Sequence, residues 1–126
     1  MRTALLFGSA HGFLAVALGA FGAHGLKSWL GDLADGAQRM AWWETASHYQ
    51  LAHAVALLVV AALAKEQSVR VPTWAFGLGT LIFSGSLYLM TLTGVRALGA
   101  VTPLGGVGMI VGWFALFVSA AKASSS

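Results

Sequence analysis

The chain has 126 residues, of which 58% are hydrophobic and 9% are charged, whereas about a quarter of the residues in a soluble domain are charged. This composition excludes an ordinary soluble domain and indicates a single integral membrane domain. The net charge of +3 comes from singly scattered basic residues, which excludes a nucleic-acid partner, and the lack of cysteine excludes disulfides and cysteine-ligated metals.

Four apolar stretches are long enough to cross a bilayer, which requires about 20 residues per helix. They cover approximately residues 4–23, 45–64, 73–92 and 104–121. Backbone groups must be paired within lipid, and none of these stretches has the alternating pattern of barrel strands. We therefore expect an all-α integral membrane four-helix bundle in one domain, residues 1–123, followed by a disordered tail at 124–126.

The first stretch has Arg2 before it and small residues after it, so a cleaved signal peptide is the alternative to a retained span. His11 lies near its middle, where we expect a neutral, hydrogen-bonded imidazole. Small residues four positions apart allow close helix approach, within the bundle or with a second copy of the chain. These pairs are Gly8 with Gly12, Ala15 with Gly19, and Gly108 with Gly112.

The connection after the first span carries Leu26, Trp29, Leu30 and Leu33 on one helical face. This spacing predicts a short amphipathic helix in the membrane interface, with an irregular soluble loop as the alternative. Trp42 and Trp43, which follow, are typical of an interfacial aromatic belt.

The flanking charges favour one orientation. Basic residues flank one side at Arg2, Lys65, Arg70 and Lys122, and the other side at Lys27, Arg39 and Arg96. Because cytoplasmic segments carry the excess of basic residues, we expect both termini in the cytoplasm.

Alternating spans bring four polar segments to one half of the bundle. Trp42, Thr45, Tyr49 and His53 share one face of the second span, with Gln50 at its edge. The other polar residues in this half are His24, Ser84, Ser86, Tyr88 and Thr102. They predict a ligand-binding site, and the alternative is that they hydrogen-bond one another between helices. Arg96, on the same membrane side, is expected to pair with a carboxylate or a lipid phosphate.

Catalytic and metal signatures are incomplete. Ser84 and Ser86 lack the setting of a nucleophile elbow, and no H-E-x-x-H motif occurs. Glu44 and His48, four residues apart, are expected to form an interfacial ion pair. We expect no metal and no cofactor, although a His24 and His53 pair would suit a metal or haem if a further ligand were supplied.

Four ordered motifs resemble one family. They are "GAFGAHGL" at 19–26, the W-x-x-T-x-x-x-Y-Q-x-x-H pattern at 42–53, "FSGSLY" at 83–88, and "TPLGG" with "GW" at 102–106 and 112–113. Together they resemble the domain of unknown function 423 family, small bacterial four-span proteins related to the animal transmembrane protein 256. The resemblance implies an inner-membrane protein, assigns no activity, and adds Pro103 to the site residues. His11 and His48 fall outside its pattern.

We therefore expect a multi-pass inner-membrane binding protein that holds a lipid-like ligand or a partner helix at the polar cluster. His24 is expected to meet Tyr49, Gln50 and His53 there. Membrane lipids are the expected partners, together with a second copy of the chain through the glycine-rich faces. The alternatives are a small transporter or channel component, and a membrane enzyme that uses His24 or His53 as a base on a lipid substrate.

Overall fold

The computed structural model describes residues 1–124 and contains four helical segments long and apolar enough to cross a membrane. The all-α fold class is therefore confirmed, and the described residues form no strand. The helices are α1 (Arg2–Phe21), η1 (Gly22–Leu26), α2 (Lys27–Leu30), α3 (Gly36–Leu63), α4 (Arg70–Thr93), η2 (Arg96–Ala100) and α5 (Thr102–Ser124). Ser124, expected in the tail, belongs to α5, and residues 125–126 lie outside the described residues.

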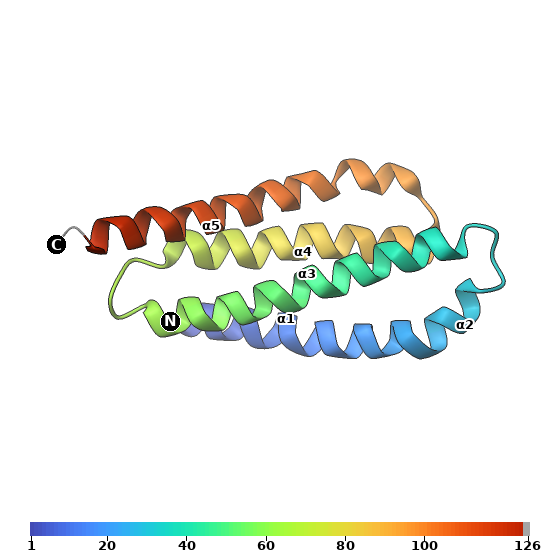
Figure 1. Ribbon diagram of the computed structural model, residues 1–126, viewed down its shortest axis with the longest axis horizontal. Helices are drawn as coiled ribbons and strands as arrows, with labels where there is room; N and C mark the ends of the chain where they lie inside the picture. Colours follow the sequence, from blue (N-terminus) through green and yellow to red (C-terminus); the bar gives the residue numbers. More distant parts are fainter. Residues whose placement is uncertain (125–126) are drawn as a thin grey trace.

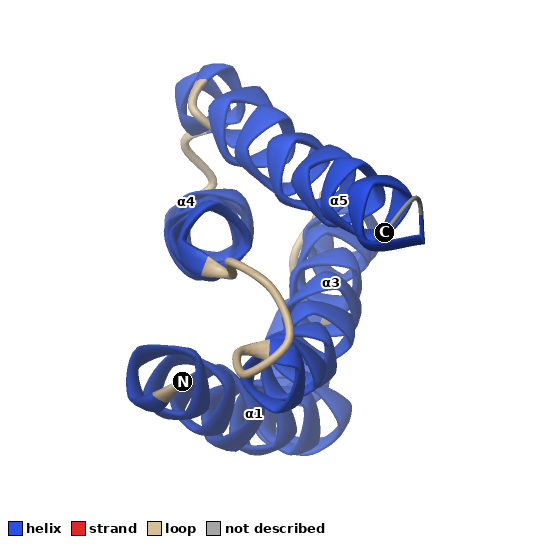
Figure 2. Ribbon diagram, turned by 90° about the vertical axis from the view of Figure 1, so that its left-hand side faces the viewer, coloured by secondary structure: helices blue, strands red, loops and turns tan. Residues whose placement is uncertain are grey.

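The long helices run up and down in chain order (Figure 1). α1 packs along α3, α3 along α4, and α4 along α5. Viewed from one end, α1 and α5 lie on opposite sides of the α3–α4 pair (Figure 2). We call the end of the bundle at which α2 lies the α2 end, and the opposite end, where α1 begins and α5 ends, the terminal end.

Glycine sets the distance between neighbouring helices at two crossings. A Cβ atom on Gly105 of α5 would lie 2.3 Å from the Phe83 nitrogen and 2.5 Å from the Gly79 oxygen of α4. A Cβ atom on Gly8 of α1 would lie 3.1 Å from the Ala54 oxygen of α3. These glycines serve contacts within the chain, so association with a second copy stays a prediction that such contacts do not test.

The segment after α1 turns inward at the α2 end. Leu26 and Leu30 are each 1% exposed, whereas Trp29 is 47% exposed. The predicted short amphipathic helix is therefore present, but it is only four residues long and continues α1 through the π-helical turn η1. Gly22 permits this turn to pack closely, because a Cβ atom there would lie 2.5 Å from the indole ring of Trp43.

Arg39 closes the α2 end by capping α4. Its Nε donates a hydrogen bond to the Thr91 oxygen at 2.7 Å, and a terminal guanidinium nitrogen donates to the Leu92 oxygen at 3.1 Å. The same group pairs with Asp35 at 3.5 Å. These bonds satisfy carbonyl groups that a helix end leaves unpaired and place a cation where the helix dipole is negative.

Candidate functional site

The predicted polar face of α3 is only partly buried. Gln50 and His53 are 3% and 6% exposed, whereas Tyr49 is 46% exposed. Thr45 is exposed and Trp42 is half-buried. The face therefore divides into a deep part between the helices and an outer part on the surface of the bundle.

Gln50 is the centre of a hydrogen-bonded chain that joins three helices. The Tyr88 hydroxyl of α4 donates to Gln50 Oε1 at 2.7 Å, and Gln50 Nε2 donates to His11 Nδ1 of α1 at 3.1 Å. His11 Nε2 in turn donates to the Gly77 oxygen of α4 at 3.0 Å. A neutral imidazole with its proton on Nε2 accepts from Gln50 and donates to Gly77, and the hydrogen-bond pattern assigns that tautomer.

His53 joins α5 to α3. Trp113 Nε1 of α5 donates to His53 Nε2 at 3.0 Å, and His53 Nδ1 donates to the Tyr49 oxygen at 2.8 Å. Phe76 of α4 packs edge-on against both rings, with centroids 5.3 Å from His53 and 4.9 Å from Trp113. Both ring nitrogens of His53 are therefore engaged within the bundle.

The serines predicted in this half also bond between helices. The Ser84 hydroxyl of α4 donates to the Ala46 oxygen of α3 at 2.7 Å. Ser86 and Thr102 lie 2.5 Å apart between α4 and α5, and Ser86 also donates to the Phe83 oxygen. The buried candidate residues thus bond one another or the backbone, which favours the alternative that they hold helices together.

Besides Trp42, Thr45 and Tyr49 on the outer part of the α3 face, three further predicted residues lie outside this cluster. His24 is exposed and its side chain forms no hydrogen bond with any described residue, so its predicted contact with Tyr49, Gln50 and His53 is wrong. The reason is local: the buried positions of η1 are Gly22 and Leu26, and His24, midway between them, projects from the other side of the helix.

Arg96 and Pro103 also lie at the surface. The Arg96 guanidinium sits over the ring of Trp42, 5.3 Å from its centroid. Arg96 pairs with no carboxylate among residues 1–124, and the alternative partner, a lipid phosphate, stays a prediction. Pro103 is exposed in the first turn of α5, where its missing N–H leaves no bond unmade.

A groove between α1 and α3 lies in this half of the bundle and combines polar and apolar walls. Its volume is about 480 Å³, and its lining includes Gly19 and Ala23 of α1 and Glu44, Ser47 and His48 of α3. Glu44 and His48 are both exposed, and the predicted ion pair between them does not form within the described chain. No group of three or more His, Cys, Asp or Glu side chains among residues 1–124 is placed to hold a metal ion.

His11 and Trp113 are the residues that sequence reasoning left out of the cluster. A signal for His11 was present, since it shares one buried helical face with Ala4, Gly8 and Ala15. Trp113 follows Gly112, which packs against the Phe76 ring. The indole of Trp113 packs against that same ring.

Comparison with known proteins agrees with this architecture. The model of the family "Protein of unknown function (DUF423)" matches residues 18–106. A UPF0382 membrane protein of Staphylococcus epidermidis is 41% identical over 124 residues, covering 97% of this chain and 98% of the relative. The UPF0382 membrane protein YwdK of Bacillus subtilis is 40% identical over 126 residues, covering 97% and 98% of the two chains.

The UPF0382 inner membrane protein YgdD of Escherichia coli K12 is 39% identical over 127 residues, covering 96% of this chain and 91% of the relative. No solved structure matches the chain. The four apolar helices and these relatives together identify a multi-pass membrane protein, and the chain belongs to the DUF423 family of membrane proteins.

Proposed function

We propose that this protein is a non-enzymatic membrane protein that binds a lipid-like ligand in the groove between α1 and α3. The groove carries the proposal, because it has a polar wall from Glu44, Ser47 and His48 and a wall of small apolar residues on α1. Ligand sites in helix bundles combine a mostly apolar lining with a few convergent polar groups. The groove lies in the same half of the bundle as the polar cluster predicted from the sequence.

The chemistry of the groove narrows the ligand. Glu44 as a carboxylate only accepts hydrogen bonds, so it favours a head group that donates from a hydroxyl or an amine. His48 completes the polar wall as either donor or acceptor. The small side chains at Gly19, Ala20 and Ala23 leave room for an acyl or isoprenoid tail beside α1.

The interhelical hydrogen bonds argue against a transporter, whereas the groove offers one feature that suits an enzyme. A transporter needs polar groups along a passage, whereas His11, Gln50 and Tyr88 are paired with one another. An enzyme acting on lipid has one supporting feature, since Glu44 and His48 stand one turn apart in the groove, and turnover of a bound lipid would favour that function.

The proposal also covers the orientation of the chain in the membrane and its association with a second copy. Both termini facing the cytoplasm is supported by the four basic residues at the terminal end, against three at the α2 end. A second copy of the chain would have to dock on surfaces other than Gly8 and Gly105, which contact neighbouring helices.

Native mass spectrometry of the chain, extracted from membranes in mild detergent, tests the binding proposal. A Cβ atom on Gly19 has Ser47 Cβ at 4.0 Å as its nearest neighbour, so Gly19→Leu should fold and fill the groove. We expect the wild type to retain a lipid that Gly19→Leu loses, and Glu44→Gln to weaken retention about tenfold, as for a hydrogen bond to a charged group.

Gly85→Leu is the matched control, because no atom lies within 4 Å of a Cβ atom at Gly85, which lies outside the groove. This variant should retain the lipid. Equal retention in all variants, or no retained lipid in the wild type, would refute the proposal. A retained peptide would also refute it, and would indicate that the groove binds a partner helix.

A further inference from the structure

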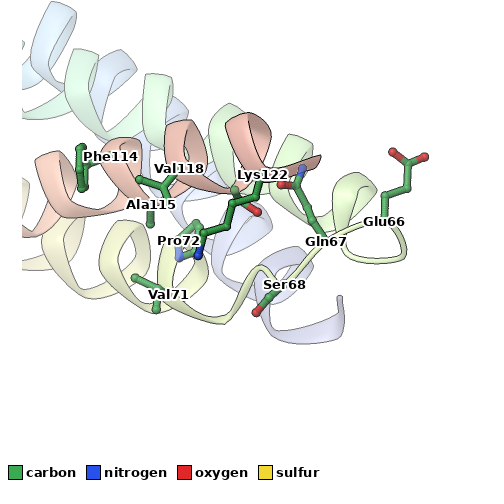
Figure 3. Close-up of a pocket in the computed structure, with 10 residues that line it drawn as sticks. Glu66, Gln67, Ser68, Val71, Pro72, Phe114, Ala115, Val118 and Lys122 are labelled. Carbon is green, nitrogen blue, oxygen red and sulfur yellow. The ribbon is translucent and has the colours of Figure 1, made fainter. Parts of the chain in front are cut away.

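A second crevice lies at the opposite, terminal end of the bundle, between the start of α4 and the last turns of α5. Its volume is about 620 Å³. Val71 and Pro72 line it from α4, Phe114, Ala115 and Val118 from α5, and Gln67 and Ser68 from the connection before α4. Figure 3 shows these apolar side chains along the two helices, with the polar residues gathered at the mouth of the crevice.

The crevice opens where the charge of the protein is concentrated. Four of the seven basic residues but only one of the four acidic residues lie at the terminal end. Lys122 lines the crevice, and Arg70 lines an adjoining cavity of about 490 Å³ that shares Val71. Figure 3 shows Lys122 extending across the crevice towards Pro72. Glu66 also lines the crevice, and its carboxylate is turned outward in the same view.

A buried hydrogen-bond acceptor without a donor in residues 1–124 lies at the mouth of the crevice. Gln67 Oε1 is buried and accepts no hydrogen bond from any described residue. Buried polar atoms are nearly always paired, so this amide oxygen at the mouth of the crevice needs a donor. A hydroxyl group on a bound molecule would supply it, and the positive charge of Lys122 would attract a phosphate on the same molecule.

We propose that this crevice binds an anionic phospholipid whose head group carries a free hydroxyl, such as phosphatidylglycerol. The phosphate lies near Lys122 and Arg70, the head-group hydroxyl donates to Gln67 Oε1, and one acyl chain runs along Val71, Phe114 and Val118. Val71 and Phe114 are 54% and 65% exposed, so the apolar wall is open to the bilayer from which the lipid enters. Basic pockets between membrane helices are suited to anionic head groups.

The test measures lipid retention by native mass spectrometry on the delipidated chain. Phosphatidylglycerol and phosphatidylcholine with identical acyl chains are added at equal concentration. We expect the wild type to retain phosphatidylglycerol preferentially, and Lys122→Gln to weaken this retention about fivefold, the effect of one basic residue near an anionic lipid. Lys65→Gln removes the same charge at the same end without lining the crevice, and should change retention less than about twofold.

A Gln67→Leu variant tests the hydroxyl contact. It should weaken the retention of phosphatidylglycerol about fivefold, as for one lost hydrogen bond. Retention of phosphatidic acid should not change, because its head group carries no alcohol hydroxyl. Equal binding of the two added lipids, equal losses from the two lysine variants, or displacement by inorganic phosphate would overturn the lipid site. Equal losses of both anionic lipids in Gln67→Leu would overturn the hydroxyl assignment.

This inference is independent of the α1–α3 groove. Gly19→Leu alters only the groove at the α2 half, so it should leave phosphatidylglycerol retention intact. If one binding site is refuted, the other is therefore still tested by its own variants.

Discussion

Replacing Gln50 by leucine should destabilise the protein, because it breaks the buried hydrogen-bonded chain that joins α1, α3 and α4. Gln50 makes two side-chain hydrogen bonds, to His11 at 3.1 Å and from Tyr88 at 2.7 Å, and is 3% exposed. Leucine has a similar volume and suits a helix at least as well, so little of the change would come from a cavity or from helix propensity.

The magnitude follows from those two bonds. Each interhelical side-chain hydrogen bond in a membrane contributes about 0.6–2 kcal/mol. Gln50→Leu also leaves the buried His11 Nδ1 and Tyr88 hydroxyl without partners. We therefore expect a loss of about 2 kcal/mol in the free energy of unfolding, which lowers the folding equilibrium constant by roughly a factor of 30.

Equilibrium unfolding by titration of sodium dodecyl sulfate into detergent-solubilised protein measures this loss. Tyr88→Phe and the double variant complete a cycle, and the coupling between the two sites should be about 1 kcal/mol. Tyr49→Phe is the matched control, because the Tyr49 hydroxyl bonds no described residue and the side chain is 46% exposed. A loss below about 0.5 kcal/mol for Gln50→Leu, or no coupling with Tyr88→Phe, would refute the role assigned to this chain of bonds.

Two further changes test the packing and the cap. Gly105→Ala places a Cβ atom 2.3 Å from the Phe83 nitrogen, so the same unfolding assay should show a loss of about 3 kcal/mol. Gly106→Ala, at 3.9 Å from Phe83 Cδ2, should be neutral or stabilising. Equal effects of the two glycine variants would contradict the tight helix crossing. Arg39→Gln should lower the free energy of unfolding by about 1 kcal/mol, because it removes the hydrogen bonds to the Thr91 and Leu92 oxygens. Lys27→Gln, which removes a charge outside this cap, should not, and equal stability of the two variants would count against the cap.

The number of membrane-spanning helices and their alternating direction were predicted from the sequence alone. Lipid leaves no partner for backbone groups, so an apolar stretch of about 20 residues has to form a helix that pairs its own backbone. This constraint predicted four spans and brought Gln50, Ser84, Ser86, Tyr88 and Thr102 to one half of the bundle, although α3 begins at Gly36 and not near residue 45 as predicted. It also explains why His11 was expected to be hydrogen-bonded.

Only the tertiary structure decided which side of each helix faces inward. Successive residues are about 100° apart around a helix, so a small rotation exchanges a buried position for an exposed one. That rotation is set by contacts between distant residues, such as Gly105 against Phe83, and it leaves Tyr49 at the surface while burying Gln50. The π-helical turn η1 similarly directs His24 outward, and the partner of His11 lies 39 positions away along the chain.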